Sequence, residues 1–483
     1  MRAMPRLLVA GLSGGSGKTI VSMAILLLLH RAGIEVRAFK KGPDYIDPAW
    51  LEWASGHPAR NLDTFLMGNT RVRLSFLRNC VSDGINLIEG NRGLFDGLDA
   101  AGTHSSAVLA ETLAAPVVLI IDATKMTRTA AALVLGCQKL DPKLSLQAVV
   151  LNNISGTRHE QVLRASIESA CSIPVIGALP RLAGNPLPER HLGLVPPQES
   201  GGINQMEQNL LRLVENNLDL NALLAIARNA PQLEPPAEEL PSPPDARGLR
   251  IGYLKDSAFS FYYPENLEEL ERAHAELIPI SALESAALPG NLHALYIGGG
   301  FPETHAPRLS ENQSFLESLR RSCEIGLPVY AECGGLMLLA RSLVWKGVRY
   351  PMASVLPIEV EVFAKPQGHG YSELHVDAHN PFFLPGAVLR GHEFHYSRIV
   401  GDVQQPVTAC AVTRGTGCFS GRDFVVAQNV LAGYTHLHAT ATPEWTRGIV
   451  AAARKFSLEA AAVSRLTRLY SPEVAGIEPS AGI

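Results

Sequence analysis

The sequence predicts an α/β protein made of two halves, each built around a largely parallel sheet. Short, continuously apolar runs alternate with helical stretches in the first half, a proline-rich stretch interrupts this pattern near the middle, and the alternation then resumes. Strands that are apolar at every position are typical of parallel sheets, because helices cover both faces of such sheets. The first half is therefore predicted to be a doubly wound parallel sheet.

Each predicted strand is a short apolar run bounded by glycine, proline or polar residues. These runs are 7–12, 35–41, 85–90, 116–123, 147–154 and 174–180 in the first half, and 249–256, 294–301 and 327–335 in the second. The run 21–30 is predicted to be a buried helix, because it is too short to cross a membrane. The proline-rich segment 231–248 is predicted to be a linker between domains at 1–230 and 249–483.

Composition excludes several classes of protein. The chain has 483 residues, of which 46% are hydrophobic and 18% charged, which indicates a globular protein of two or three domains. A net charge of −4 argues against nucleic acid as a partner. The seven cysteines form no CxxC pair, which argues against a zinc site or a disulfide framework. We therefore expect a cytoplasmic protein with small-molecule partners and no membrane partner.

A glycine-rich loop, GLSGGSGKT (11–19), separates the first predicted strand from a predicted helix, which is the context that a P-loop requires. The backbone N–H groups expected to cradle nucleotide phosphates belong to Gly14, Gly15, Ser16 and Gly17. Lys18 is placed to reach the β and γ phosphates, and Thr19 to hold Mg²⁺. The loop has one residue more between its outer glycines than the usual pattern, so a chance glycine-rich turn is the alternative.

Acidic residues follow the second and third predicted strands. Asp44 and Asp47 lie in a Gly/Pro loop, where they are placed to help bind a metal or a substrate. Glu89 ends the third strand, as an acid that binds Mg²⁺ beside a P-loop does. The alternative for all three is an ordinary turn, in which Asp and Pro are common.

The second half carries a candidate nucleophile. Cys333 lies between a predicted strand and a predicted helix, which is the nucleophile-elbow arrangement with cysteine in place of serine. The helix N-terminus is expected to lower the pKa of the thiol. Amide groups of Gly299, Gly300 and Gly334 are candidates for an oxyanion hole. A buried structural cysteine is the alternative.

Two histidines near the end of the chain, His436 and His438, are candidates for the base that deprotonates Cys333. Class I glutaminases usually have His-x-Glu, in which the Glu orients the base, whereas here the second position is His438. The third member of a triad is therefore missing or replaced, and we favour His436 as the base. The polar stretch 391–397 (GHEFHYS) is predicted to line a cleft.

Together these motifs resemble the cobyrinic acid a,c-diamide synthase family. The matching stretches are GLSGGSGKT (11–19), FKKGPDYIDP (39–48), GLFDG (93–97), LPERHLGLVP (187–196), GGGFPE (298–303), YAECGGLM (330–337), GHEFHYS (391–397) and YTHLH (434–438). The resemblance implies an N-terminal ATPase half similar to dethiobiotin synthetase and a C-terminal class I glutamine amidotransferase half of the triad type. It also implies an ATP- and glutamine-dependent ligase that amidates the a and c acetate groups of cobyrinic or hydrogenobyrinic acid in cobalamin biosynthesis.

The resemblance further assigns roles to individual residues. It implies catalysis by Cys333 with His436 or His438, ATP binding by the P-loop with Asn152 near adenine, and Mg²⁺ as the cofactor. The implied metal ligands are Thr19, Glu89 and Asp47. The implied substrate-binding residues are Asp44, Tyr45, Asp47, Asn91, Arg92 and Asp96. The oligomeric state stays open, with a homodimer as the candidate.

Two departures from the family pattern concern the acceptor. The usual EGVMGLFDG is here EGNRGLFDG, with Asn91 and Arg92 in a loop expected to meet substrate carboxylates, and the stretch 123–131 also differs. An added arginine suits a more acidic macrocycle, so sirohaem or (nickel-)sirohydrochlorin is the alternative acceptor. A P-loop switch ATPase with a degenerate glutaminase domain is the alternative of another class.

Overall fold

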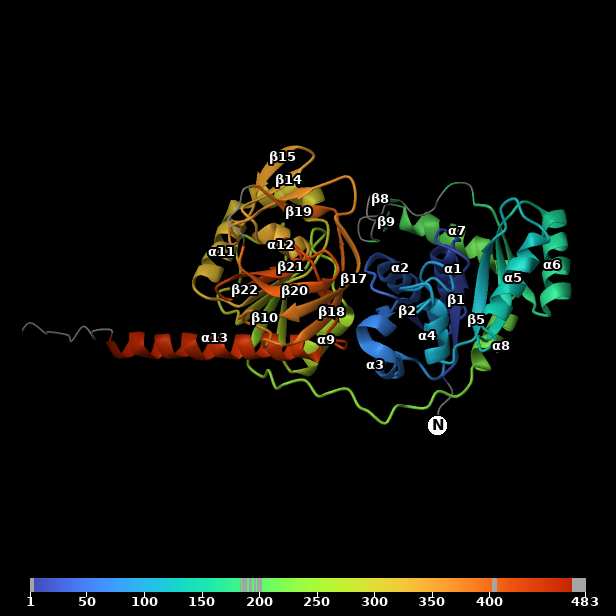
Figure 1. The fold of residues 1–483 in the computed structure, drawn as a ribbon, viewed down its shortest axis with the longest axis horizontal. Helices are drawn as coiled ribbons and strands as arrows, with labels where there is room; N and C mark the ends of the chain where they lie inside the picture. Colours follow the sequence, from blue (N-terminus) through green and yellow to red (C-terminus); the bar gives the residue numbers. More distant parts are fainter. Residues whose placement is uncertain are drawn as a thin grey trace, which may run out of the picture.

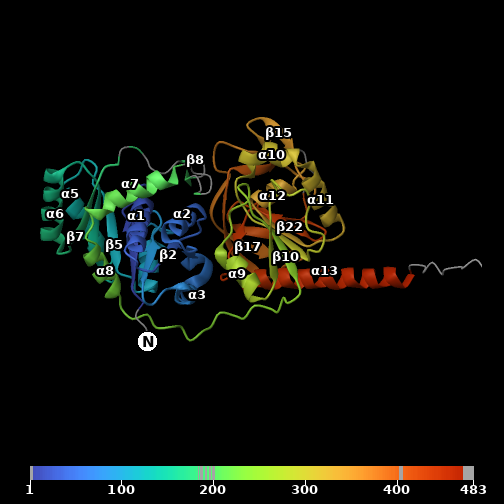
Figure 2. The same ribbon diagram turned by 180° about the vertical axis from the view of Figure 1, so that it is seen from behind.

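The computed structural model describes residues 4–182, 184, 189–190, 193–194, 197, 202–401 and 406–470. Its two halves lie side by side, each around its own large sheet (Figures 1 and 2). In this part of the chain, no helix is both long and apolar enough to cross a membrane. The predicted α/β fold class is confirmed.

The first half is built on a sheet whose seven described strands follow the order β3-β2-β4-β1-β5-β6-β7, with every pairing parallel. These strands are β1 (Arg6–Gly11), β2 (Val36–Lys41), β3 (Arg60–Leu62), β4 (Ile85–Glu89), β5 (Val117–Asp122), β6 (Leu146–Ile154) and β7 (Val175–Pro180). All but β3 match a predicted run to within one residue at each end. The three residues of β3 are too few to show a pattern.

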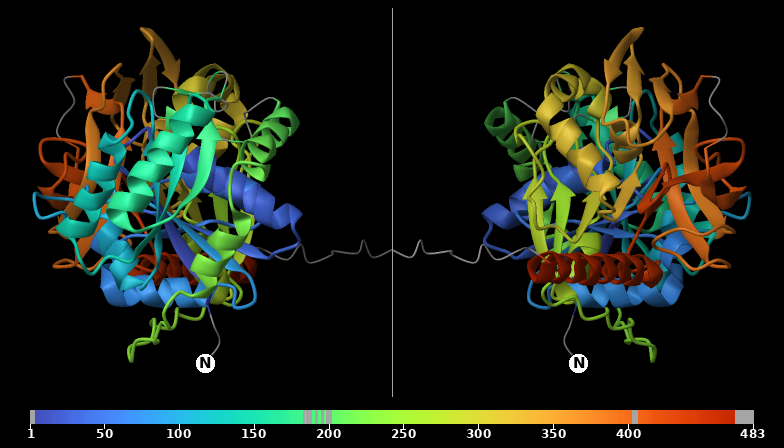
Figure 3. Two further views of the ribbon diagram at one scale, coloured as in Figure 1. Left: turned by 90° about the vertical axis from the view of Figure 1, so that its right-hand side faces the viewer. Right: turned by 90° about the vertical axis from the view of Figure 1, so that its left-hand side faces the viewer.

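Helices cover both faces of this sheet (Figure 3). On one face lie α1 (Lys18–Arg31), α2 (Ile46–Ser55), α7 (Ile203–Glu215) and α8 (Leu220–Arg228). On the other lie α3 (Thr64–Asn79), α4 (Ser106–Thr112), α5 (Thr129–Leu140) and α6 (Thr157–Cys171). Alternate residues of β1, such as Leu7 and Leu8, enter opposite cores, which explains why the strand is apolar throughout. Most of the motif at 187–196 lies outside the described residues, apart from the short pair β8 (Glu189–Arg190) and β9 (Gly193–Leu194).

The second half is built on a mixed sheet, whose ten described strands follow the order β11-β10-β12-β13-β22-β21-β20-β17-β18-β23. Its parallel part contains β10 (Arg250–Leu254), β11 (Glu276–Ile280), β12 (Ala294–Ile297), β13 (Val329–Glu332) and β22 (Val430–Gly433). Its antiparallel part contains β17 (Gly368–Val376), β18 (Val388–His395), β20 (Thr408–Arg414), β21 (Arg422–Ala427) and β23 (His436–Leu437). The antiparallel part is absent from the sequence-based strand prediction, because its strands mix buried and exposed residues.

The remaining elements of the second half surround this sheet. A smaller sheet contains β14 (Ser342–Trp345), β15 (Val348–Pro351), β16 (Glu359–Val362) and β19 (Ser397–Val400). The helices are α9 (Pro264–Arg272), the 3₁₀ turn η2 (Pro302–His305), α10 (Ala306–Glu311), α11 (Gln313–Glu324), α12 (Gly334–Leu339) and α13 (Pro443–Tyr470). Helix α13 runs along the base of the second half and extends away from the first (Figure 1).

The two halves meet through polar contacts as well as through the connecting chain. Residues 229–249, all of which the structure describes, contain no helix or strand and run along one side of both halves (Figure 1). Across the interface, Arg60 of β3 pairs with Glu268 of α9, and Arg78 of α3 pairs with Glu269 at 2.8 Å. These contacts bring β17 and β18 of the second half against the carboxyl edge of the first sheet, where Tyr371 donates a hydrogen bond to Asp63.

Candidate active site

The glycine-rich loop joins β1 directly to α1, which is the local structure that the sequence predicts. Gly17 has a φ of 90°, a left-handed conformation that glycine adopts without strain. A Cβ atom at Gly17 would lie 2.3 Å from the side-chain nitrogen of Asn152, so glycine is also required by space. That Asn152 nitrogen donates to the Ser16 carbonyl oxygen at 3.1 Å. Asn152 therefore holds the loop that would surround the nucleotide phosphates.

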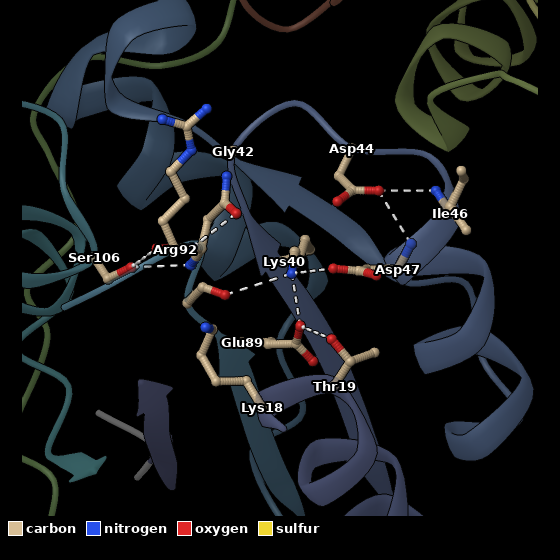
Figure 4. Close-up of polar contacts among 12 residues, drawn as sticks. Lys18, Thr19, Lys40, Gly42, Asp44, Ile46, Asp47, Glu89, Arg92 and Ser106 are labelled. Atoms are coloured by element: carbon tan, nitrogen blue, oxygen red, sulfur yellow. Dashed lines mark hydrogen bonds and ion pairs between the residues drawn. The ribbon is translucent and has the colours of Figure 1, made fainter. Parts of the chain in front are cut away.

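A buried ion-pair network lies beside this loop (Figure 4). The Lys40 ammonium lies 2.5 Å from a carboxylate oxygen of Asp47 and 2.6 Å from one of Glu89. Thr19 donates its hydroxyl proton to that same Glu89 oxygen at 2.9 Å. Burial by itself lowers the pKa of Lys40, but the carboxylates of Asp47 and Glu89 outweigh burial and raise it above its usual value. Lys40 is therefore a charged member of the site that the residue-level prediction missed, although it lies within the motif at 39–48.

The oxygen atoms at this place suit a magnesium ion. Thr19, Glu89 and Asp47 supply a hydroxyl and two carboxylates, which are hard ligands of the kind that Mg²⁺ takes together with nucleotide phosphates. The second carboxylate oxygen of Glu89 is buried and has no hydrogen-bond partner among the described residues, which leaves it free to bind a cation. Within that same part of the chain, no three His, Cys, Asp or Glu side chains gather into a metal site by themselves. The residues therefore fit an ion that is shared with a bound nucleotide.

A cavity of about 460 Å³ lies between the two halves. The first half contributes Lys41, Pro43, Asn91, Arg92, Asp96, Gly97, Leu98 and His104 to its lining. The second half contributes His369, Gly370, Tyr371, His392, Glu393, Phe394, Arg414 and Gly415. Both the predicted substrate loop and the polar stretch 391–397 therefore border one cavity, and three cationic side chains face it.

The other predicted substrate residues are not among the residues that line this cavity. A side-chain oxygen of Asp44 accepts hydrogen bonds from the backbone N–H groups of Ile46 and Asp47, at 2.9 and 3.0 Å, and so fixes the start of α2. Burial, with the neighbouring Asp47 carboxylate, raises the pKa of Asp44. Asp47 faces Lys40, and Tyr45 points into the second half, where it meets His436.

Cys333 occupies a sharp turn between β13 and α12. Its φ of 48° and ψ of −98° are a strained combination for a residue with a side chain, as at a nucleophile elbow. Its backbone N–H donates to the carbonyl oxygen of Gly433 at 2.7 Å, which places the turn beside the segment leading to His436. Burial, followed by the carboxylate of Glu303, raises the pKa of the Cys333 thiol. The expectation of a lowered pKa for Cys333 is wrong for this structure, because burial and the Glu303 carboxylate outweigh the lowering effect of the Gly334 N–H at the start of α12.

The predicted oxyanion-hole residues lie together around this turn. A Cβ atom at Gly334 would lie 3.2 Å from the Gly300 backbone nitrogen, so the two backbones approach closely. A Cβ atom at Gly299 would lie 2.7 Å from the Cε1 atom of His436, so glycine leaves the space that the imidazole occupies. The Gly299–Gly300 turn is therefore bordered by the turn of Cys333 on one side and by His436 on the other.

Glu332 takes the place of the glutamate that this sequence lacks two positions after His436. Its side chain lies 3.2 Å from the Nδ1 atom of His436 and accepts a hydrogen bond from the Leu437 N–H at 3.0 Å. His438 is instead fully buried, 3.6 Å from a carboxylate oxygen of Glu265. The acid beside His436 thus comes from the residue before the nucleophile, a position that the sequence pattern does not reveal.

Each half of the chain matches a known domain family, and nearly the whole chain is similar to known proteins. Residues 7–194 match the CobQ/CobB/MinD/ParA nucleotide binding domain, and residues 250–444 match the CobB/CobQ-like glutamine amidotransferase domain. A cobyrinate a,c-diamide synthase of Magnetococcus marinus is 42% identical over 92% of this chain and 96% of its own. The chain belongs to the cobyrinate a,c-diamide synthase family. Enzymes of the same name from Dehalococcoides mccartyi and Archaeoglobus fulgidus are 38% and 36% identical, each over 94% of this chain and at least 98% of their own.

Membership of the cobyrinate a,c-diamide synthase family confirms the resemblance and the expected domain types.

Two matched substitutions distinguish whether His436 or His438 is the base in this cobyrinate a,c-diamide synthase family member. Replacing Glu332 by Gln should lower glutamine-dependent turnover on the order of 10⁴-fold, because the carboxylate that orients and stabilises the His436 imidazolium is lost. Replacing Glu265 by Gln makes the same chemical change beside His438 and should leave turnover close to wild type. Rates of glutamate release measure both, and the reverse ranking would assign the base to His438.

Proposed function

We propose that this chain uses ATP and glutamine to amidate the a and c acetate carboxylates of cobyrinic or hydrogenobyrinic acid in cobalamin biosynthesis. Residues 1–230 would form the half that binds ATP and the tetrapyrrole, residues 231–248 the linker, and residues 249–483 the glutaminase. The cavity between the halves carries the proposal: Lys41, Arg92 and Arg414 present positive charge from both sides to a polycarboxylate.

In the glutaminase half, His436 accepts the proton of Cys333, and the thiolate attacks the amide carbon of glutamine. Backbone N–H groups of Gly299, Gly300 and Gly334, which lie close together around the turn of Cys333, would hold the oxyanion. The C–N bond then breaks, His436 returns the proton to the departing nitrogen, and ammonia leaves a thioester on Cys333. Water hydrolyses this thioester, which releases glutamate and restores the thiol.

In the ATP half, the substrate carboxylate displaces ADP from the γ phosphorus and becomes an acyl phosphate. Lys18 would hold the phosphates, and Thr19, Glu89 and Asp47 would hold Mg²⁺, which neutralises phosphate charge when it is bound. Ammonia attacks the acyl carbon and expels phosphate, which gives the amide. Phosphate is needed because a carboxylate by itself has no adequate leaving group.

A direct assay tests the acceptor. With cobyrinic acid, ATP, Mg²⁺ and glutamine, we expect the mass of the tetrapyrrole to change in two successive steps. Each step corresponds to the conversion of one carboxylate to an amide, and each depends on ATP. A parallel incubation with sirohaem and nickel sirohydrochlorin tests the second candidate, which the added Arg92 in the cavity lining favours because these macrocycles carry more carboxylates. Amidation of only the latter compounds would reassign the substrate.

Three further points remain proposals with their own tests. A switch ATPase with a degenerate glutaminase predicts no glutamate release, and the pairing of His436 with Glu332 argues against it. Cytoplasmic location can be checked by cell fractionation. A homodimer can be checked by light scattering at several protein concentrations.

A further inference from the structure

Tyr45 belongs to the ATP half, but its side chain lies against the glutaminase site. It belongs to the loop between β2 and α2, yet its ring packs on four aromatic side chains of the other half. The ring centroids lie 5.2 Å from Phe261, 4.7 Å from Tyr263, 5.6 Å from His392 and 5.2 Å from His436. The Tyr45 hydroxyl is buried, so the contact is an insertion and not a surface touch.

The His436 ring is enclosed by this contact. On one side lies the Gly299 turn, where even a Cβ atom would come within 2.7 Å of the imidazole. His392 stacks on the ring with the centroids 5.0 Å apart and an interplanar angle of 23°. Tyr45 meets the ring edge-on at 61°, and Glu332 holds Nδ1. The orientation of the proposed base therefore depends on where Tyr45 lies.

The position of Tyr45 is in turn tied to the ATP site. Tyr45 immediately precedes α2, whose start is fixed by Asp44 and whose first turn contains Asp47. Asp47 is held by Lys40, and Lys40 also holds Glu89, which accepts the hydroxyl proton of Thr19. A continuous set of contacts thus leads from the P-loop helix to the proposed base of the glutaminase (Figure 4 shows its ATP-site part).

We propose that Tyr45 is a positioning residue that makes glutamine hydrolysis depend on the state of the ATP site. This rests on the proposed function, because it requires both half-reactions. A cation bound beside Thr19 competes with Lys40 for the carboxylates of Glu89 and Asp47, and nucleotide phosphates compete with those carboxylates for the Lys40 ammonium. A shift of Asp47 moves the first turn of α2, and with it the Tyr45 ring against His436. The first turn of α2, with Tyr45, then links the two sites, because binding at either site can shift its position.

The test compares glutamate release in two conditions. One contains glutamine alone, and the other also contains tetrapyrrole, Mg²⁺ and a non-hydrolysable ATP analogue. In the wild type we expect stimulation of about tenfold, and in Tyr45→Ala a ratio of about one, which is within the usual range of coupling between sites. Tyr45→Phe keeps the ring contacts and should keep most of the stimulation.

Arg78→Ala is the matched control, because it removes an ion pair across the same interface without touching His436. It should retain stimulation, and thermal unfolding of all three variants shows whether each one folds. Stimulation that is lost equally in Arg78→Ala would reduce Tyr45 to general interface packing and overturn the proposal, as would an unstimulated wild type.

Amide formation from ammonium separates this inference from the proposed function. If the wild type forms no amide from ammonium, ATP and any of the tetrapyrroles, the proposed function fails. If amide forms but Tyr45→Ala keeps full stimulation, only the inference fails. A raised KM for the tetrapyrrole with stimulation intact would make Tyr45 a substrate contact and would likewise overturn the positioning role.

Discussion

Cys333→Ala should abolish amide formation from glutamine while leaving amide formation from ammonium salts close to wild type. The thiolate is the group that attacks glutamine, so its removal should lower glutamine-dependent turnover on the order of 10⁶-fold, to background. Ammonium supplies the nucleophile of the second half-reaction directly, and Cys333 belongs to the other half, in the turn between β13 and α12. The measurement is amide formed per ATP hydrolysed with each nitrogen source in turn.

Cys323→Ala is the matched control for this experiment. Cys323 is also buried, but it lies on α11 away from the turn that carries Cys333. Its replacement should leave both nitrogen sources usable. If ammonium fails to support Cys333→Ala in a protein that still unfolds cooperatively, the two half-reactions are not separable and the division of roles between the halves is wrong.

Lys40→Met should abolish the activity of the ATP half and leave the carboxylates of its proposed metal site without the lysine that now pairs with them. The substitution leaves the buried Glu89 and its neighbour Asp47 without their shared cation, which should lower the free energy of unfolding by about 3–5 kcal/mol in the absence of metal. Amide formation should fall with either nitrogen source. Added MgCl₂ should restore more stability to Lys40→Met than to the wild type, because the ion then has the two carboxylates to itself.

Lys41→Met provides the comparison for this result, because Lys41 is the adjacent buried lysine. It lines the interdomain cavity and contacts the Tyr371 hydroxyl at 3.2 Å, so its loss should raise the KM for the tetrapyrrole. Its unfolding should gain no additional dependence on MgCl₂. Denaturant titrations with and without MgCl₂ measure both variants, and equal magnesium effects in the two would place the ion elsewhere.

The sequence predicts the first half of the molecule better than the second for a physical reason. Parallel strands are buried on both faces, so β1 and β5 stand out as unbroken apolar runs. Strands such as β17 bury only part of their side chains and therefore resemble ordinary loops in composition. In the second sheet the prediction consequently includes β10, β12 and β13, omits β11 and β22 of the parallel part, and omits the antiparallel part.

Some residues of the site belong to local sequence motifs, whereas others come together only through tertiary contacts. The loop before Lys18 and the turn at Cys333 are local motifs with recognisable spacing. Glu332 was missed because its partner His436 is more than a hundred residues away, although the two meet at 3.2 Å. The direction of Tyr45 depends on how the halves pack together, which no spacing within a single half encodes.

The attachment of Glu332 beside Cys333 has a mechanical consequence. Glu332 is the last residue of β13 and Cys333 follows it directly in the turn, so the covalent chain limits the distance between the orienting acid and the nucleophile. His436 comes from β23, about a hundred residues further along the chain, so its position relative to the other two groups is set by tertiary contacts. Assembling the reactive geometry therefore requires two segments of the chain to come together, and not three.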